Sequence, residues 1–405
     1  MAGEKNKTGC LDMGSGTPEY RLPPFTLLDE PVPSTAYAST QIMEEKAKII
    51  QATLEEFGVQ CQVTHFEPGP TVTSYEITPA PGVRVESISG LERNLAIALQ
   101  SSVCIRKMIL HKSAVGIEVP NTNRSLVHLR ELADNSEFHN PERALPLALG
   151  KDVCRQIVLG DLAEMPHLLI TGAGGMGKTV CINSLLLGLL LTRTPDQVQL
   201  ILIDLKKFEF PLYEFIGHLA MPIIEKAKEA ELGLSWAIGE MERRYELFKM
   251  AKVRDIKSYN ALVDNADEKS ETKLPYIVIV IDELAELMSS ARQEIEPRIV
   301  RLAQLSRVTG IHMVLATQRP SENVFTDIIK VNVPARIAFR TAAGSDSRAI
   351  INAIGAENLP DKGALLYLPP GQNAPVFLQG MWVSDEEIRR VTSWLCSQRT
   401  EETIA

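Results

Sequence analysis

Residues 172–179 have the types and spacing that can hold the phosphates of a nucleotide. They fit G-x-x-x-x-G-K-[ST] at every fixed position, between the apolar run His167–Thr171 and an apolar helical stretch that starts at Val180. Glycines let backbone N–H groups wrap a phosphate, and the start of a helix favours negative charge. We expect Lys178 to reach the β- and γ-phosphates of ATP and Thr179 to ligate Mg²⁺. The candidate nucleotide-binding residues are Gly172, Ala173, Gly174, Gly175, Met176, Gly177, Lys178 and Thr179.

Two carboxylates follow a second apolar run. Tyr276–Ile281 is continuously apolar and ends in Asp282 and Glu283. If this run is a strand parallel to the first, both carboxylates lie beside residues 172–179 at the carboxyl edge of one sheet. We expect Asp282 to support the Mg²⁺ shell and Glu283 to polarise the attacking water. The pair favours nucleotide hydrolysis over kinase chemistry, because a kinase must exclude water rather than activate it.

Polar residues also follow two further apolar runs. Gln318 comes directly after Ile311–Thr317 and is a candidate sensor, because its amide could hydrogen-bond the γ-phosphate or its water. Three charged residues follow the run Gln199–Ile203, and they belong either to the same site or to a salt-bridged rim. These residues are Asp204, Lys206 and Glu209.

Basic residues elsewhere could meet phosphates. One predicted helix, residues 294–308, carries three arginines that either are solvated surface residues or include one presented to the γ-phosphate of a neighbouring subunit in a ring. A basic stretch after Gln318 either follows nucleic-acid phosphates or carries ordinary surface charge. The arginines are Arg298, Arg301 and Arg307, and the stretch holds Lys330, Arg336, Arg340 and Arg348.

Positioning these residues requires a parallel sheet, and the pattern predicts one. From Met165 onward, apolar runs alternate with longer helical stretches, which is typical of an α/β fold with helices on both faces of the sheet. Before it, a helix ending near Gly58 and short alternating runs form a compact α+β unit without a catalytic-looking cluster. We predict a charged surface loop over 260–273 and a last helix that starts after Ser384 with Glu387 in a capping box.

The predicted organisation has three parts. Residues 1–36 read as a disordered leader and a Pro-rich linker, residues 37–160 as a smaller α+β module, and residues 161–405 as a P-loop ATPase with a C-terminal helix. This division fits a length of 405 residues at roughly 150 per domain.

Composition excludes several classes of protein. With 45% hydrophobic and 23% charged residues the chain is globular, and its net charge of −9 means that any DNA binding must come from a local patch. The six cysteines form no CxxC pair and the histidines show no zinc-site spacing. No apolar run is long enough to span a bilayer and the N-terminus lacks the apolar core of a signal peptide, so we expect a soluble, cytoplasmic protein with reduced cysteines.

Several strings, taken together, resemble one known family. From about Ile42 to about Trp394, the chain is similar to the motor region of the FtsK/SpoIIIE DNA translocases. The first three of the strings fall in the N-terminal module rather than in the ATPase. The strings are Glu67–Pro70, Gly116–Asn121, Leu149–Asp152, Met165–Leu169, Met241–Tyr245, Gly310–His312, Ala316–Pro320 and Arg336–Phe339.

The resemblance implies an α-domain followed by a RecA-like β-domain, and a homo-hexameric ring that threads double-stranded DNA at the expense of ATP. Arg307 falls where the family places its trans-acting arginine finger. Arg319, Lys330 and Arg348 fall on family positions associated with channel loops that touch the DNA backbone. Chromosome segregation at cell division or sporulation is the role that the resemblance implies.

The chain also departs from the family pattern. Ile203-Asp-Leu-Lys206 lacks a proline that the family has in this turn, and the aspartate that usually follows Gly-x-Gly is replaced within Asp361–Ala364. The sequence shows neither a membrane anchor nor a winged-helix module. It is therefore either a motor fragment or a short paralogue that a partner recruits to a membrane or division septum.

Other functions stay open. A mobile-element DNA-transfer motor is the nearest alternative, and a protein-secretion ATPase of the same fold or a nucleotide-binding scaffold without turnover are alternatives of other classes. The sequence leaves open the ring size, the direction of translocation, and which DNA is moved.

Overall fold

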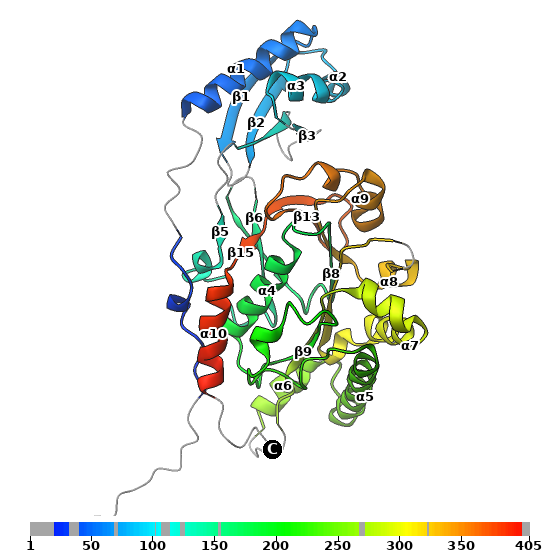
Figure 1. The fold of residues 1–405 in the computed structure, drawn as a ribbon. Helices are drawn as coiled ribbons and strands as arrows, with labels where there is room; N and C mark the ends of the chain where they lie inside the picture. The colour runs from blue at the N-terminus through cyan, green and yellow to red at the C-terminus, as the bar shows by residue number, and fades with distance from the viewer. Residues whose placement is uncertain are drawn as a thin grey trace, which may run out of the picture.

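The computed structural model describes residues 20–31, 40–68, 72–101, 103–106, 114–121, 126–152, 155–266, 272–321 and 324–398. Two bodies are visible in Figure 1, a small α+β module built on a four-stranded sheet and a larger α/β body built on a nine-stranded sheet. This α/β class was predicted from the sequence and is confirmed. Among the described residues, no helix is both long enough and apolar enough to cross a membrane.

The N-terminal module has its own hydrophobic core. Its antiparallel sheet has the order β1-β2-β4-β3, and its longest helix supplies Ile50 and Leu54 to a core that also contains Tyr75 and Ile117. Gly58 follows this helix at φ +75°, the left-handed conformation expected of a helix cap. The elements are α1 (Thr40–Glu56), β1 (Cys61–Pro68), β2 (Val72–Pro79), α2 (Val85–Ser89), α3 (Glu92–Ala98), β3 (Cys104–Arg106) and β4 (Val115–Pro120).

The large sheet is mixed, with the order β7-β6-β14-β13-β12-β8-β11-β10-β9. The five strands from β12 to β9 run parallel, and the strands from β13 to β7 add to them in antiparallel fashion. The strands are β6 (Pro146–Lys151), β7 (Ile157–Asp161), β8 (His167–Thr171), β9 (Val198–Ile203), β10 (Tyr276–Ile281), β11 (Ile311–Thr317), β12 (Ala335–Phe339), β13 (Ala364–Leu368) and β14 (Val376–Gln379). A separate pair joins β5 (Val127–His128) to β15 (Met381–Trp382) in parallel.

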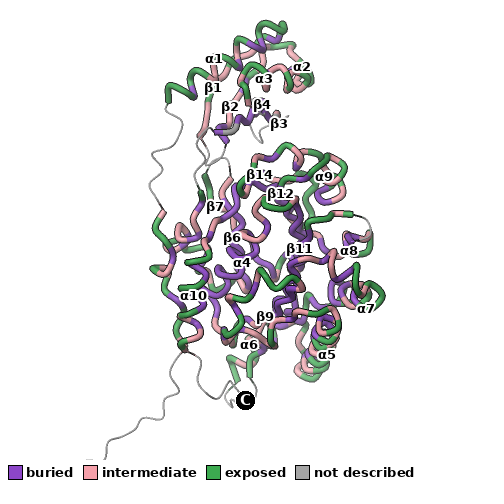
Figure 2. The backbone as a smooth tube through the Cα atoms, in the orientation of Figure 1, coloured by how far each residue is buried: buried purple, intermediate pink, exposed green. Residues whose placement is uncertain are grey.

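Helices cover both faces of the large sheet. On one face, α4 (Lys178–Thr192) and α10 (Asp385–Ser397) pack with Leu168 and Ile170 of β8. The other face packs with Leu169 and is covered by α5 (Ala227–Ala251), α7 (Leu284–Leu305), α8 (Asp327–Asn332) and α9 (Gly344–Ile351). Because alternate residues of a strand face opposite sides, its continuous apolar run is buried on both, as the purple strands of Figure 2 show.

The N-terminal segment 20–31 packs against the large body. Leu28 is 3% exposed in the same core as α4 and α10, and it follows the short helix η1 (Phe25–Leu27). The guanidinium of Arg390 on α10 donates to the Leu27 carbonyl and pairs with Asp29 at 2.6 Å. This part of the predicted leader and linker is therefore ordered on the ATPase body, as the blue segment beside red α10 in Figure 1 shows. Residues 1–19 and 32–39 lie outside the described residues.

The apolar runs named in the sequence are confirmed as the parallel strands β8, β9, β10 and β11, and two other predictions were wrong. Pro146–Lys151 and Ile157–Asp161 form β6 and β7 of the large sheet, so the boundary predicted at residue 160 cuts through the ATPase body rather than preceding it. The predicted helix over 294–308 is the second half of α7, and it ends at Leu305. Arg307 therefore lies in the short helix η4 (Arg307–Thr309), not on the helix of Arg298 and Arg301.

The predicted loop over 260–273 also begins too early. It overlaps α6 (Ile256–Asp264), where Ile256 and Tyr259 are buried against Phe248 in a small core of their own. Of the charged residues in this stretch, only Asp264 lies in the helix, and the others follow it. Residues 267–271 lie outside the described residues.

Candidate active site

The P-loop, residues 172–179, connects β8 to α4 as the sequence predicts. Gly177 has φ +117°, and a Cβ atom there would come within 2.9 Å of the Gly363 Cα atom. At Gly172, an added Cβ would lie 2.5 Å from the Phe339 Cβ atom. Both positions require glycine because the loop is pressed against the ends of β12 and β13. The loop thus presents its backbone at the start of α4, where N–H groups favour an anion.

Lys178 and Thr179 lie at the first turn of α4. The Lys178 side chain is buried, and burial lowers its pKa, although the nearby Glu283 and Asp282 carboxylates oppose that shift. The Thr179 hydroxyl donates to Glu209 Oε1 at 3.0 Å. An ammonium with little water around it gains more from a phosphate than an exposed one, so the arrangement suits a nucleotide.

Asp282 follows the end of β10 and lies near three other carboxylates. Burial raises its pKa to about 7, with further increases from Glu209, Asp204 and Glu283, while Lys178 acts in the opposite direction. A divalent cation beside these carboxylates would offset their repulsion, and oxygen ligands are what Mg²⁺ prefers. Asp282 and the Thr179 hydroxyl therefore fit the predicted Mg²⁺ ligands.

Glu283 is held by its neighbours rather than by solvent. Its side chain is 9% exposed; Oε1 accepts the Thr317 hydroxyl at 2.6 Å, and the Gln318 N–H lies 3.2 Å from each carboxylate oxygen. The Lys206 ammonium lies 3.6 Å from Oε2. Glu283 is also the N-cap of α7 and accepts from the Ala285 N–H at 3.3 Å. Sequence reasoning missed Thr317, although it ends the strand that carries Gln318.

Gln318 lies between the P-loop and the carboxylates, because β11 is paired with β8 on one side and with β10 on the other. Its side-chain Oε1 atom would lie 3.4 Å from a Cβ atom placed on Gly174. The amide therefore faces the phosphate loop, while its backbone N–H holds Glu283. This position is compatible with the predicted sensor role.

The charged residues of the turn after β9 have two different roles: one stabilises the turn, and two contact the candidate site. Asp204 is 1% exposed and accepts the backbone N–H groups of Lys206, Lys207, Glu209 and Phe210. It thereby shapes a turn that presents Glu209 to Thr179 and Lys206 to Glu283. From the sequence, these residues belonged either to the site or to a salt-bridged rim beside it. Asp204 supports the turn, and Glu209 and Lys206 contact the candidate site residues.

Arg307 lies at the opposite edge of the sheet from the P-loop. It directly precedes β11, whose amino end is distant from the carboxyl edge where Glu283 and Lys178 lie. Its side chain is exposed. Arg307 therefore lies away from its own P-loop, and its role as an arginine finger acting in trans stays a prediction.

The predicted DNA-contacting residues lie on three separate elements. Arg319 is exposed after β11, Lys330 lies on α8 with its ammonium 3.3 Å from Asp327, and Arg348 is exposed on α9. Arg336, from the same basic stretch, is 7% exposed and donates to the Lys330 and Ile350 carbonyls. Arg336 is thus a structural residue, whereas Arg340 pairs with Asp361 at the surface.

Comparison with known proteins places this geometry in a family. A model described as the FtsK/SpoIIIE family matches residues 128–322, and one described as the FtsK alpha domain matches residues 22–121. The protein named DNA translocase FtsK from Caldanaerobacter subterraneus subsp. tengcongensis is 46% identical over 378 residues, which cover 93% of this chain and 52% of that protein. DNA translocase SftA of Bacillus subtilis is 44% identical over 380 residues, 94% of this chain and 40% of SftA.

The chain thus spans about half the length, or less, of these relatives. Among solved structures, the monomer of the pCW3 conjugation coupling protein TcpA with ATPγS matches with a TM-score of 0.61 at 22% identity. That match covers 88% of this chain and all of the TcpA chain. At this identity the likeness shows the fold, which is that of a P-loop ATPase.

Proposed function

The chain belongs to the FtsK/SpoIIIE family, and on this premise we propose that it is the motor region of an ATP-dependent translocase of double-stranded DNA. The observation that carries the proposal is the meeting of the P-loop, Asp282 and Glu283 at one sheet edge, with Glu283 held against the loop that leads to Arg319. The first part supports ATP hydrolysis. The second supports a link between hydrolysis and the DNA.

Each site residue has a role in the proposed reaction. Lys178 and the P-loop N–H groups bind and orient the triphosphate, and Gln318 contacts the γ-phosphate or its water. Glu283 accepts a proton from the attacking water. Thr179 and Asp282 would hold Mg²⁺, which neutralises charge on the phosphates when bound.

A ring assembly is part of the proposal. Arg307 is exposed at the edge opposite its own P-loop, so a homo-oligomer in which it faces the next subunit's γ-phosphate would complete the site. A hexamer is the form that family membership suggests. Arg319, Lys330 and Arg348 would grip DNA through its phosphates, with little sequence preference and strong dependence on salt.

The cellular role is proposed in the same way. The relatives are named DNA translocases, which supports the movement of DNA. Chromosome segregation at division or sporulation is the role that the family resemblance implies. In this role the motor works in the cytoplasm, and a membrane anchor or an orienting partner directs it to the septum.

The steady-state rate of ATP hydrolysis, with and without long linear duplex DNA and at low and high salt, tests the proposal. We expect strong stimulation by DNA that falls with salt and is absent in Lys178→Ala. Robust hydrolysis that ignores DNA would favour a protein-secretion ATPase. No hydrolysis under any condition would point to a nucleotide-binding scaffold.

A further inference from the structure

Arg336 is a buried cation on β12 that no carboxylate neutralises. Its residue surface is 7% exposed, and burial lowers its pKa. Within the described part of the chain, no acidic side chain forms an ion pair with it. A buried guanidinium is costly unless hydrogen bonds satisfy it, so its partners indicate what it is there to hold.

The guanidinium connects the carboxyl ends of α8 and α9. Its Nη2 group donates to the Lys330 carbonyl at 2.7 Å, and its Nε group donates to the Val333 carbonyl at 3.3 Å, both at the end of α8. Its Nη1 group donates to the Ile350 carbonyl at 2.9 Å, at the end of α9, and lies 3.4 Å from Asn352 Oδ1. Carbonyls at the end of a helix lack partners within the helix. One side chain therefore supplies donors to two helix ends at once.

The same two helix ends carry cations that we propose to contact DNA. The Lys330 ammonium lies 5.7 Å from the centroid of the Phe325 ring, and the Arg336 guanidinium carbon lies 5.7 Å from the same centroid. Arg348 is exposed in the last turn of α9, two residues before Ile350. Both helices cover the same face of the large sheet, and Figure 1 shows them beside each other. Arg336 thus holds the backbone from which both cations extend.

Strand β12 joins this arrangement to the centre of the sheet. Arg336 is paired with Leu169 of β8 on one side and with Leu368 of β13 on the other. Because β8 leads into the P-loop, the two helix ends are fixed to the strand that positions the phosphate loop. Arg319 is held differently, since its N–H donates to the Thr317 hydroxyl oxygen at 3.1 Å. Its position therefore does not depend on Arg336.

We propose that Arg336 is a positioning residue for DNA binding, which holds Lys330 and Arg348 in one fixed arrangement so that they contact phosphates as a unit. Its planar fork of donors can bond two separate helix ends, whereas a lysine ammonium is a single point of charge. Cations that are already fixed lose less entropy on binding than cations on helices that move independently. The inference rests on the proposed function, because it requires duplex DNA to lie against α8 and α9.

The salt dependence of DNA binding separates this role from a purely structural one. Each phosphate contact adds about 0.9 to the magnitude of the slope of log K against log salt, so two contacts account for roughly tenfold of the change in affinity between about 50 and 200 mM salt. Fluorescence anisotropy of a labelled duplex of mixed sequence, with Mg²⁺ and ATPγS present, measures this slope. Arg336→Met should reduce it as much as the double variant Lys330→Ala with Arg348→Ala. Adding Arg336→Met to that double variant should reduce it no further.

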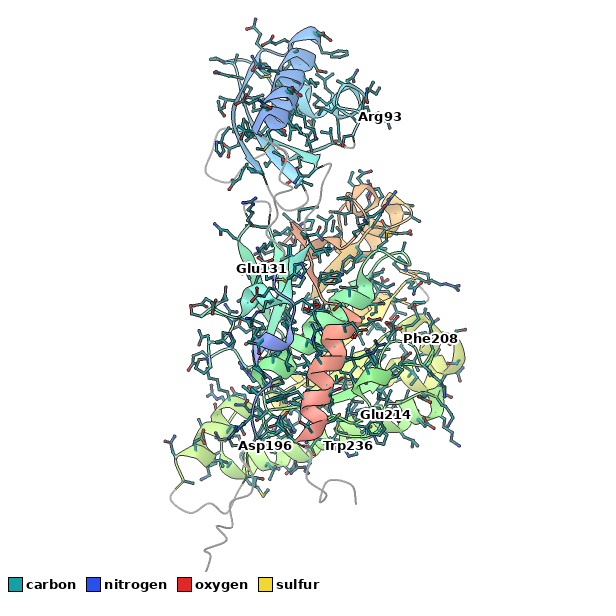
Figure 3. The ribbon with its side chains drawn as sticks, turned by 60° about the vertical axis from the view of Figure 1, so that its left-hand side comes forward. Arg93, Glu131, Asp196, Phe208, Glu214 and Trp236 are labelled. Atoms are coloured by element: carbon teal, nitrogen blue, oxygen red, sulfur yellow. The ribbon has the colours of Figure 1, made fainter. Side chains whose placement is uncertain are left out.

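Arg193→Met is the matched control. Arg193 is 8% exposed and also donates to carbonyls, those of Thr192 at 2.7 Å and Ala144 at 3.1 Å. It follows α4, which covers the other face of the sheet from α8 and α9. Figure 3 shows Asp196, three residues later, at the bottom of the large body and orange α9 at its top. Arg193→Met should lower the temperature of thermal unfolding comparably but leave the salt slope of DNA binding unchanged.

Three results would overturn the positioning role. They are a wild-type slope in Arg336→Met, a further reduction when Arg336→Met is added to the double variant, and an equal reduction in Arg193→Met. If Arg336→Met does not fold, Arg336→Lys keeps the charge but loses the fork. Its slope should fall between those of the wild type and the double variant, and a wild-type slope there would contradict the proposal.

The wild type and the double variant distinguish this inference from the proposed function. A wild-type chain that binds duplex DNA with salt dependence, together with an unchanged slope in Lys330→Ala with Arg348→Ala, would overturn the inference alone, because Arg336 would have no DNA contact to position. A wild-type chain that does not bind duplex DNA would overturn the proposed function and the inference with it.

Discussion

At the scale of single residues, the Glu283 carboxylate is restrained by hydrogen bonds and an ion pair. A carboxylate that accepts the Thr317 hydroxyl and the Gln318 N–H, and faces Lys206, has little capacity left to orient water. The same loop continues into Arg319, whose N–H donates to the Thr317 hydroxyl oxygen at 3.1 Å. Displacement of Arg319 would therefore be transmitted to the base through one side chain.

Thr317→Val should raise ATP hydrolysis in the absence of DNA by about tenfold or more, because a hydrogen bond to a charged group contributes roughly 1.5–3 kcal/mol. The ratio of DNA-stimulated to basal rate should fall accordingly. Steady-state ATPase assays measure both. Thr171→Val is the register-matched control on β8, since its buried hydroxyl has no hydrogen-bond partner among the described residues. A lower basal rate in Thr317→Val would show instead that the threonine positions Glu283 productively.

Asp282 gives a prediction in pH. Its folded-state pKa of about 7 exceeds the ordinary aspartate value of 3.8, so ionisation opposes folding. Stability is therefore lost as pH rises from the ordinary pKa to the folded one. Asp282→Asn should therefore stabilise the nucleotide-free protein at and above pH 7, by up to about 4 kcal/mol at 1.36 kcal/mol per pKa unit. The gain should disappear toward pH 4. Denaturant unfolding of both proteins across this range measures it, and a gain independent of pH would refute the mechanism.

At the scale of elements, α10 connects two distant parts of the chain. Its N-cap Ser384 accepts from the Glu387 N–H, Glu387 accepts from the Ser384 N–H in return, and the other Glu387 oxygen accepts the Asp29 N–H at 3.0 Å. One capping box therefore both begins helix α10 and binds the N-terminal segment through Asp29.

Ser384→Ala should lower the stability of the ATPase body by about 1 kcal/mol, the usual cost of a lost N-cap. Thermal or denaturant unfolding checks the value. Ser397→Ala, at the other end of the same helix, is the control, because its hydroxyl bonds the Trp394 carbonyl within the helix. Equal losses in both variants would mean that the cap adds nothing specific.

The elements also show which parts of the fold could be predicted from the sequence. The parallel strands were predictable because each is a short apolar run that ends in a polar motif, as β10 does at Asp282. The antiparallel addition was not, since nothing local in β6 or β14 indicates which distant strand it pairs with. Of the site, the P-loop and the carboxylates follow from their spacing. The contacts of Glu283 with Thr317 and Lys206 depend on strand neighbours that no spacing reveals.

At the scale of the whole molecule, the N-terminal module has a hydrophobic core of its own, although Val72 of β2 packs with the core on the α5–α7 face of the large sheet. Leu54 is fully buried in the core of the N-terminal module, away from the clusters that surround β8. Leu54→Ala should cost about 2–5 kcal/mol of stability within that module. Calorimetric unfolding should show a lower temperature for one transition and an unchanged second transition. A single transition that shifts as a whole would show that the two cores unfold together.

The path of the chain gives the segment 20–31 a mechanical meaning. The chain is anchored on the ATPase body at Leu28, leaves to build the N-terminal module, and returns to the same core at Val127. The module is thus inserted into the ATPase body rather than joined to it in tandem. A module joined at one end only could rotate about its single connection. This module is joined to the ATPase body at both ends, beside α10 through Leu28 and at β5 through Val127, so a force on the module would be transmitted through both connections.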